Sequence, residues 1–326
     1  MRILFWGTPE FAVPSLRALA EEGHALVAVV TQPDKPAGRG RKLQASPVKL
    51  LAEEEEIPVL QPVRASEPDF VAQIEALAPD ISIVVAYGQI LSDEVLSAPR
   101  LGTFNVHASL LPELRGAAPI NWAIIQGHSH TGVSIIRLVR ELDAGPVLEA
   151  VSAELPPDMV AGELATILAE LGALALINNL AQLEMGQANE QEQDHERATY
   201  APKLSRDIVR VDWNRSAEEI GRWLRGCDPR PGAWTELEGA PIQLFAPRIE
   251  DGGEEPSAEP ANAAAGQANA AAEPGTVLEA DPKSGLLVAT GAGALHVGEV
   301  RPAGKPRMAA TAWISGRGVE AGQVFE

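Results

Sequence analysis

Residues 104–112 read Phe-Asn-Val-His-Ala-Ser-Leu-Leu-Pro, and the rest of the chain is best understood around them. The segment begins as a short apolar run, and Pro112 ends regular structure in a turn. If the run is extended, Asn105 and His107 project to the same side, because side chains alternate along a strand. A polar pair at a strand end, beside a turn, is typical of the ligand-binding edge of an α/β sheet. Taken alone, the segment fits an ordinary strand with one structural histidine equally well.

The residues before this segment alternate between apolar runs and amphipathic runs. Arg2 to Trp6 predicts a strand, and Gly7-Thr8-Pro9 predicts a turn in which Thr8 caps a helix that ends near Glu22. Apolar runs at 25–31 and 80–86 predict further buried strands. This alternation predicts an α/β fold with a doubly wound, Rossmann-like, mostly parallel sheet. No G-x-G-x-x-G sequence follows the first strand, which disfavours a dinucleotide site.

The residues after the segment predict how the first domain ends. Two β-branched runs, 131–139 and 147–151, flank a turn at Asp143 and predict an antiparallel pair. A long Ala/Leu helix at 160–185 then closes a first domain at residues 1–188. Residues 189–206 are polar and acidic, a composition that predicts a linker.

A different texture marks the second domain, residues 207–326. Ser216 predicts a capped helix start, and short strands with frequent Gly and Pro follow, which predicts a small β-barrel. Residues 251–273 are a low-complexity Ala/Glu/Gly/Asn run and predict a disordered acidic loop. The last residues, 311–326, carry little charge and suggest no role.

Composition limits the class of protein. The chain has 326 residues, 45% hydrophobic and 22% charged, which fits a globular protein of about two domains. No uninterrupted run of 18 apolar residues occurs, so we expect no membrane span. The single cysteine, Cys227, excludes an intramolecular disulfide and is interpreted as a buried apolar residue. We therefore expect a cytoplasmic protein.

A formal net charge of −19 argues against a nucleic-acid partner, but one segment reverses the sign. Residues 32–46 lack periodicity and concentrate four cations, Lys35, Arg39, Arg41 and Lys42. Many charged loops are simply solvated. The position of this one after a parallel strand favours a basic arm that binds a polyanion.

Asn105, His107 and Asp143 are the candidate catalytic residues. Asn and His side chains can donate hydrogen bonds to a developing oxyanion, and a carboxylate can hold an imidazole protonated or accept a proton. The set suits transfer of an acyl-type group to a neutral nucleophile without a covalent enzyme intermediate. The sequence has no G-x-S-x-G or H-E-x-x-H motif, and its six histidines lack metal-ligand spacing. We expect no metal.

These residues carry a resemblance to a known family. Residues 105–112, with the Arg115-Gly116-Ala117-Ala118-Pro119 that follows, resemble the N-x-H-x-S-L-L-P…R-G-x-x-P signature of 10-formyltetrahydrofolate-dependent formyltransferases. Residues 142–145 match the L-D-x-G of the family. Within it, the members that formylate methionyl initiator tRNA are similar at residues 7–11, 31–40, 85–88 and 302–305. The resemblance covers nearly the whole chain.

The resemblance implies transfer of the formyl group of 10-formyltetrahydrofolate to methionyl initiator tRNA for translation initiation. Asn105 and His107 would stabilise the oxyanion, and Asp143 would orient His107 and assist proton transfer. The folate would lie against Ser109, Leu110, Leu111, Pro112, Tyr87 and Gly88. The tRNA would meet Lys35, Arg39, Arg41 and Lys42, and an OB-like C-terminal domain. We expect a monomer without a membrane partner.

Three alternatives stay open. A relative could formylate another amine, such as glycinamide ribonucleotide or an amino sugar, although the basic arm argues against both. A second could hydrolyse formyl-folate with water. A third, from a different class, is a catalytically silent RNA-binding protein, which the intact Asn105, His107 and Asp143 disfavour.

Overall fold

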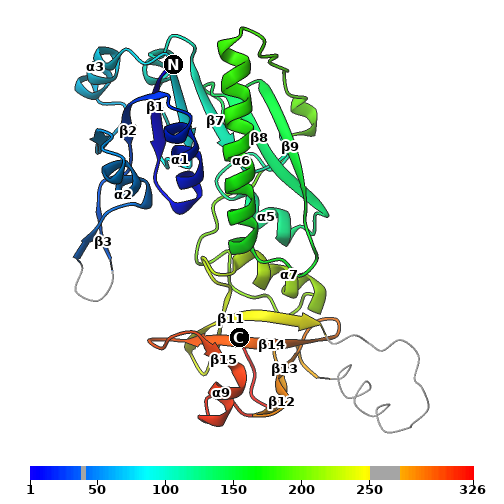
Figure 1. The fold of residues 1–326 in the computed structure, drawn as a ribbon. Coiled ribbons are helices and arrows are strands. Elements are labelled where there is room, and N and C mark those ends of the chain that lie inside the picture. The colour runs from blue at the N-terminus through cyan, green and yellow to red at the C-terminus, as the bar shows by residue number, and fades with distance from the viewer. Residues whose placement is uncertain (38–41, 250–271) are drawn as a thin grey trace. The chain divides into compact units, whose positions relative to one another are not determined.

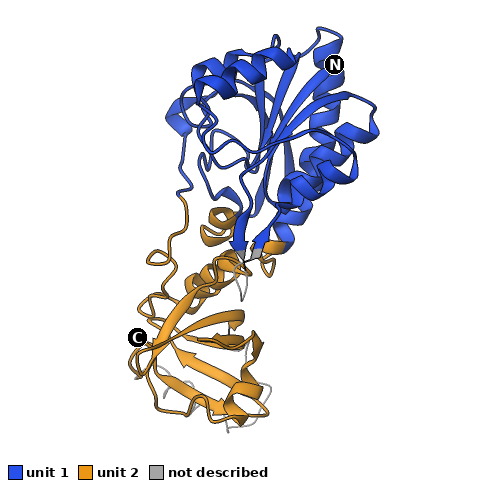
Figure 2. Cartoon of the chain, turned by 90° about the vertical axis from the view of Figure 1, so that its left-hand side faces the viewer, with its two compact units in different colours: residues 1–120, 129–155, 163–202 blue, residues 121–128, 156–162, 203–326 orange. Residues whose placement is uncertain are grey.

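The computed structural model describes residues 1–37, 42–249 and 272–326 (Figure 1). They form two compact units (Figure 2). Unit 1 comprises residues 1–120, 129–155 and 163–202, and unit 2 comprises residues 121–128, 156–162 and 203–326. The predicted domain borders at residues 188 and 207 stay predictions, because the two units interleave along the chain.

Unit 1 is built on a sheet with the strand order β5-β2-β1-β6-β7-β8-β9. The strands are β1 (Arg2–Gly7), β2 (Ala25–Val30), β5 (Val59–Leu60), β6 (Ile81–Val85), β7 (Thr103–His107), β8 (His130–Arg137) and β9 (Val147–Glu154). Strands β5, β2, β1, β6 and β7 pair in parallel. Strand β8 pairs antiparallel with both β7 and β9. The predicted mostly parallel, Rossmann-like sheet and its antiparallel pair are confirmed.

Helices cover this sheet. They are α1 (Val13–Glu21), α2 (Pro47–Glu54), α3 (Pro68–Leu77), α4 (Asp93–Ser97) and α6 (Ala161–Glu184), and α5 (Pro119–Ile125) leads into unit 2. Phe70 and Ile74 of α3 and Val95 of α4 pack with Trp6 and Val84 of the sheet in one buried cluster. That cluster fixes the face of the sheet on which α3 and α4 lie.

Helix α6 lies on the opposite face. By length and composition it is the one described helix that could cross a membrane, and half of its apolar window is buried inside the protein. A Cβ added at Gly172 would lie 2.7 Å from Val106 of β7, and the Asn179 amide donates to Glu149 of β9. The apolar face of α6 therefore packs on the sheet, as in a core helix.

Thr8 does not cap the first helix, so that prediction was wrong. The short 3-10 helix η1 (Glu10–Ala12) begins after Pro9 and has no side-chain cap. The Thr8 hydroxyl instead donates to the main-chain oxygen of Tyr87 at 3.1 Å and accepts from the N–H of Gln32 at 3.3 Å. The hydroxyl is used to join the carboxyl ends of β1, β2 and β6.

Unit 2 contains an antiparallel sheet with the order β10-β11-β14-β13-β12, to which β15 adds beside β14. The strands are β10 (Trp234–Leu237), β11 (Ala240–Ile249), β12 (Val277–Asp281), β13 (Gly285–Ala289), β14 (Ala294–Pro302) and β15 (Met308–Ala309). Helices α7 (Ala217–Cys227) and α9 (Ala310–Ser315) accompany them. Ser216 caps α7 in a capping box with Glu219, as predicted.

The C-terminal residues 323–326 close this sheet into a small barrel. The N–H of Glu326 donates to Glu236 in β10, and the N–H of Val277 in β12 donates to Gln323. Since β10 and β12 are the two ends of the strand order, these bonds join its edges. The predicted β-barrel is confirmed, and the chain end has a structural role that composition did not suggest.

The sequence predicts loops in two segments, the basic segment at 32–46 and the acidic segment at 251–273. The basic segment contains a short antiparallel pair, β3 (Lys35–Ala37) and β4 (Lys42–Gln44), where we expected no regular structure. That expectation was wrong because strands this short leave no periodic pattern. Arg39 and Arg41 lie outside the described residues, as does the predicted acidic loop apart from its last two positions.

Candidate active site

Strand β7 holds Asn105 and His107 on the face of the sheet away from α6. Val106, between them, points to α6, because a Cβ at Gly172 of that helix would touch it. The alternation of a strand then directs both neighbours to the other face. His107 is buried and Asn105 half-buried. The predicted polar pair on one face therefore exists in the structure.

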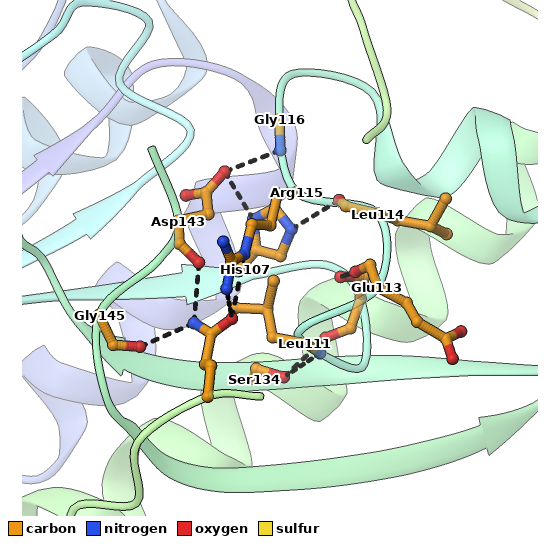
Figure 3. Close-up of polar contacts among 11 residues, drawn as sticks. His107, Leu111, Glu113, Leu114, Arg115, Gly116, Ser134, Asp143 and Gly145 are labelled. Atoms are coloured by element: carbon orange, nitrogen blue, oxygen red, sulfur yellow. Dashed lines mark hydrogen bonds and ion pairs between the residues drawn. The ribbon is translucent and has the colours of Figure 1, made fainter. Parts of the chain in front are cut away.

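His107 is held by two groups from elsewhere in the chain (Figure 3). Its Nε2 lies 3.1 Å from the main-chain oxygen of Leu114. A carbonyl oxygen only accepts hydrogen bonds, so Nε2 carries the hydrogen in this contact. Its Nδ1 lies 3.7 Å from Oδ2 of Asp143, close enough for an ion pair when the imidazole is protonated. The structure thus brings together His107 and Asp143.

Two backbone features hold the Asp143 side chain in this position. Asp143 has a φ of 50°, in the left-handed region, and its Oδ2 accepts a 2.8 Å bond from the N–H of Gly116. A side chain at Gly145 would collide with the main-chain oxygen of Arg137. The D-x-G pattern is therefore explained locally, because only glycine allows this close approach of two backbones.

Residues 109–112 were predicted to line the folate site. The Ser109 hydroxyl is buried and donates to the main-chain oxygen of Glu113 at 2.6 Å. Ser134 of β8 donates to the main-chain oxygen of Ser109 and accepts from the N–H of Leu111. These bonds use Ser109 to shape the loop. The side chains of Leu110, Leu111 and Pro112 are only half-buried and can face a ligand.

Tyr87 and Gly88, also predicted at the folate site, follow β6. The Tyr87 ring is buried at 5.2 Å from the Trp6 ring in an edge-to-face contact, and burial raises the pKa of its hydroxyl to about 12. Its main-chain oxygen accepts bonds from Thr8 and Gln32. Gly88 is exposed, with a φ of 92°. Any ligand contact here would come from the backbone, not from the tyrosine ring.

The predicted tRNA residues lie in and around the β3–β4 pair. Lys35 is exposed in β3, and Lys42 begins β4. Asp34, just before β3, accepts 2.8 Å hydrogen bonds from Lys49 and Gln61, and these bonds lower the pKa of its carboxyl group. The base of the basic segment is therefore fixed to α2, by residues that the sequence analysis did not single out.

Gln193 is the main site residue that sequence reasoning missed. We assigned it to a linker, but its side chain is buried and bonds to the Asp143 turn and to Arg115. The R-G-x-x-P pattern marks Arg115, whereas a glutamine in a polar run gives no signal of its own.

Unit 2 has a groove of about 430 Å³ whose lining includes cations and one half-buried tryptophan. Its lining includes Arg206, Arg301, Lys305 and Trp234. The Arg206 guanidinium lies 4.8 Å from the Trp234 ring centroid. Other cations of unit 2 are engaged by carboxylates: Arg210 by Glu236, Arg222 by Glu218 and Arg307 by Asp228.

No metal-binding cluster is present in the described ranges. Nowhere in those ranges do three or more His, Cys, Asp or Glu side chains come together in a way that could hold an ion.

Comparisons with known proteins identify the family of this chain. The formyl transferase family model matches residues 1–180, and the model for the formyl transferase C-terminal domain matches residues 203–318. These two matches, together covering most of the chain, define a formyltransferase. HypX from Aquifex aeolicus, solved in complex with tetrahydrofolic acid, has the same fold, with a TM-score of 0.62 and 20% identity over 96% of this chain. The chain spans 46% of HypX.

Closer relatives specify the kind of formyltransferase. The methionyl-tRNA formyltransferase of Desulfotalea psychrophila is 42% identical over 326 residues, which is 100% of this chain and 96% of the relative. That of Symbiobacterium thermophilum is 45% identical over 325 residues, 100% of this chain and 95% of the relative. The chain belongs to the methionyl-tRNA formyltransferase family.

Proposed function

We propose that this chain transfers the formyl group of 10-formyltetrahydrofolate to the amino group of methionyl initiator tRNA, giving N-formylmethionyl-tRNA. The observation that carries the proposal is full-length identity of 42% and 45% to two enzymes named for this activity. The arrangement of Asn105, His107 and Asp143 supports the same chemistry.

Asn105 is proposed to bind the formyl oxygen. Its side chain is half-buried, and no hydrogen bond to its amide is found among the described residues. A free amide donor beside a buried imidazole fits a carbonyl that gains negative charge. Strand β7 fixes the backbone from which this amide projects.

His107 is proposed to donate the second hydrogen bond and to move a proton. To do so it shares or releases its Nε2 bond to Leu114, and its 3.7 Å separation from Asp143 shortens. The amine nitrogen first adds to the formyl carbon, and the carbonyl π electrons move to the formyl oxygen to give a tetrahedral oxyanion. When the carbonyl re-forms, the bond from that carbon to the folate nitrogen breaks. The proton lost by the amine passes through His107 and Asp143 to the folate nitrogen.

The tRNA is proposed to meet two basic surfaces. One is the β3–β4 segment with Lys35, Arg39, Arg41 and Lys42, whose base is tied down through Asp34. The other is the groove with Arg206, Arg301 and Lys305. A cationic groove beside an aromatic ring suits a nucleic-acid backbone and a stacked base. We also propose a cytoplasmic monomer with no membrane partner.

One assay tests the activity. The protein is incubated with 10-formyltetrahydrofolate carrying a labelled formyl carbon, and with methionyl initiator tRNA, glycinamide ribonucleotide, an amino sugar or no acceptor. We expect label in the tRNA alone. Asn105→Ala and His107→Ala should each lower kcat by about 10²–10³-fold, by loss of one oxyanion donor. Turnover close to wild type in both variants would remove these residues from the mechanism, and label in formate alone would identify a hydrolase.

A further inference from the structure

We propose that Gln193 is a positioning residue, which fixes the Asp143 carboxylate beside His107 by joining the Asp143 turn to the loop at Arg115. The proposal rests on the proposed function, since it concerns the same reaction. Gln193 touches neither reacting group. It would act through Asp143.

The side-chain amide of Gln193 is buried and uses its full hydrogen-bonding capacity. Its Nε2 donates to the main-chain oxygens of Asp143 at 2.8 Å and of Gly145 at 2.7 Å. Its Oε1 accepts from Nε of Arg115 at 3.1 Å and from Nη2 at 2.6 Å. Two acceptors on one side and a guanidinium on the other allow only one orientation of the amide.

Gln193 joins two segments, the Asp143 turn and the loop at Arg115, and both segments also hold the Asp143 carboxylate. Gly116, next to Arg115 in the chain, donates its N–H to Oδ2 of Asp143. Gln193 donates a hydrogen bond to the main-chain oxygen of the same aspartate, whose φ of 50° is left-handed. The Gly116 bond holds the Asp143 carboxylate beside the loop that carries Arg115 (Figure 3). Gln193 bonds to both Arg115 and the Asp143 backbone, so it fixes that backbone relative to the same loop.

Gln193 is itself held at both ends. Before it, Gln191 pairs with Val147 of β9 through main-chain bonds of 2.8 and 2.9 Å. After it, Thr199 accepts from the N–H of Leu114 through its hydroxyl and from the N–H of Arg115 through its main-chain oxygen. The amide thus sits on a backbone fixed to both structures that it connects, as a positioning group requires.

Two substitutions separate its contacts. Gln193→Met keeps the length of the side chain and removes all four hydrogen bonds. Gln193→Glu keeps the acceptors for Arg115 but sets carboxylate oxygens against the carbonyls of Asp143 and Gly145, so only the turn is released. Gln191→Met is the matched control, because that side chain is exposed and Gln191 contacts Val147 through its main chain.

Steady-state kinetics with methionyl initiator tRNA and 10-formyltetrahydrofolate give the test. We expect both Gln193 variants to lower kcat by about 10- to 100-fold, as a small misplacement of a catalytic group does. The KM for each substrate should stay within about two-fold, because no ground-state contact is removed. Gln191→Met should match the wild type. Melting curves would identify a variant that does not fold. If Gln193→Met does not fold, Gln193→Glu, which keeps its contact with Arg115, provides the test in its place.

A double-mutant cycle with Asp143→Asn tests whether Gln193 acts through Asp143. If it does, Gln193→Met causes no further loss of kcat in the Asp143→Asn protein. A kcat within about two-fold of wild type in the folded Gln193 variants, or losses that multiply in the cycle, overturns the proposal. If the wild type is active but the Gln193 variants give either of these results, only the role of Gln193 is refuted. A wild type that formylates no tRNA refutes the proposed function itself.

Discussion

At the scale of single residues, Cys227 offers a clean test of the interior of unit 2. Its thiol is buried at the end of α7, and burial raises its pKa from 9.0 to about 12. The neutral thiol is a poor nucleophile, so at pH 8 the native protein should react with a disulfide reagent at least about 100-fold more slowly than the unfolded protein. Absorbance of the released thiolate measures both rates.

The same shift has a pH consequence with a defined sign. The folded state binds the thiol proton more tightly than the unfolded state, so the contribution of Cys227 to stability is complete below pH 9.0 and is lost as pH rises toward 12. Cys227→Ala should lack this loss and should not react in either state. Rapid labelling of the native wild type at pH 8 would contradict the burial.

The placement of Asn105, His107 and Asp143 could be predicted because the sequence marks a strand end and a turn at these positions. Gln193 could not, because its partners lie 48, 50 and 78 residues earlier and two of them are main-chain oxygens, which impose no residue pattern. The Tyr87 ring shows the opposite case. The family resemblance implied a ligand contact for this residue, whereas its ring packs on Trp6 in the core.

At the scale of elements, the closure of the barrel depends on Phe325. The ring is buried and stacks on Trp213 at 5.6 Å, within the segment that bonds to both edge strands. Phe325→Ala should lower the free energy of unfolding by about 3–5 kcal/mol, as large-to-small changes in a core do. Urea unfolding followed by tryptophan fluorescence reports on this unit, since every tryptophan except Trp6 lies in unit 2.

Val324→Ala is the control for this measurement. The neighbouring side chain is 40% exposed, so its loss should cost about 0.5 kcal/mol. Equal midpoints for the two variants would mean that the ring does not hold the closing segment. An unchanged midpoint for Phe325→Ala would refute the role directly.

The elements that could be predicted are those whose sequence carries a clear apolar run or a helix-capping pattern. Strand β7 and the strands of the barrel follow from apolar runs, and the start of α7 follows from Ser216 and Glu219. The β3–β4 pair and α9 are too short for a period to emerge. Barrel closure escaped prediction because residues 323–326 contribute isolated backbone bridges, whose partners are set by tertiary position.

At the scale of the whole molecule, the net charge of the protein and that of the proposed tRNA substrate are both negative. A net charge of −19 repels a polyanion at long range, and only local cationic surfaces can attract it. Ion pairs consume several of the cations of unit 2, such as Arg222 and Arg307. Arg206 and Lys305 line the groove, and no ion pair of either one is found among the described residues. The proposed binding should therefore depend on a few phosphate contacts.

Salt dependence measures how many such contacts exist. Each phosphate contact adds about 0.7–0.9 to the slope of log affinity against log salt concentration, because a bound cation displaces counterions. Arg206→Ala and Lys305→Ala should each weaken methionyl initiator tRNA binding and reduce that slope by about 1, with the KM for 10-formyltetrahydrofolate unchanged. Lys283→Ala, at the exposed turn between β12 and β13 and not lining the groove, should keep the wild-type slope. If all three variants keep that slope while tRNA remains a substrate, the phosphate contacts lie outside the groove, and the β3–β4 segment with Arg39 and Arg41 becomes the surface to vary next.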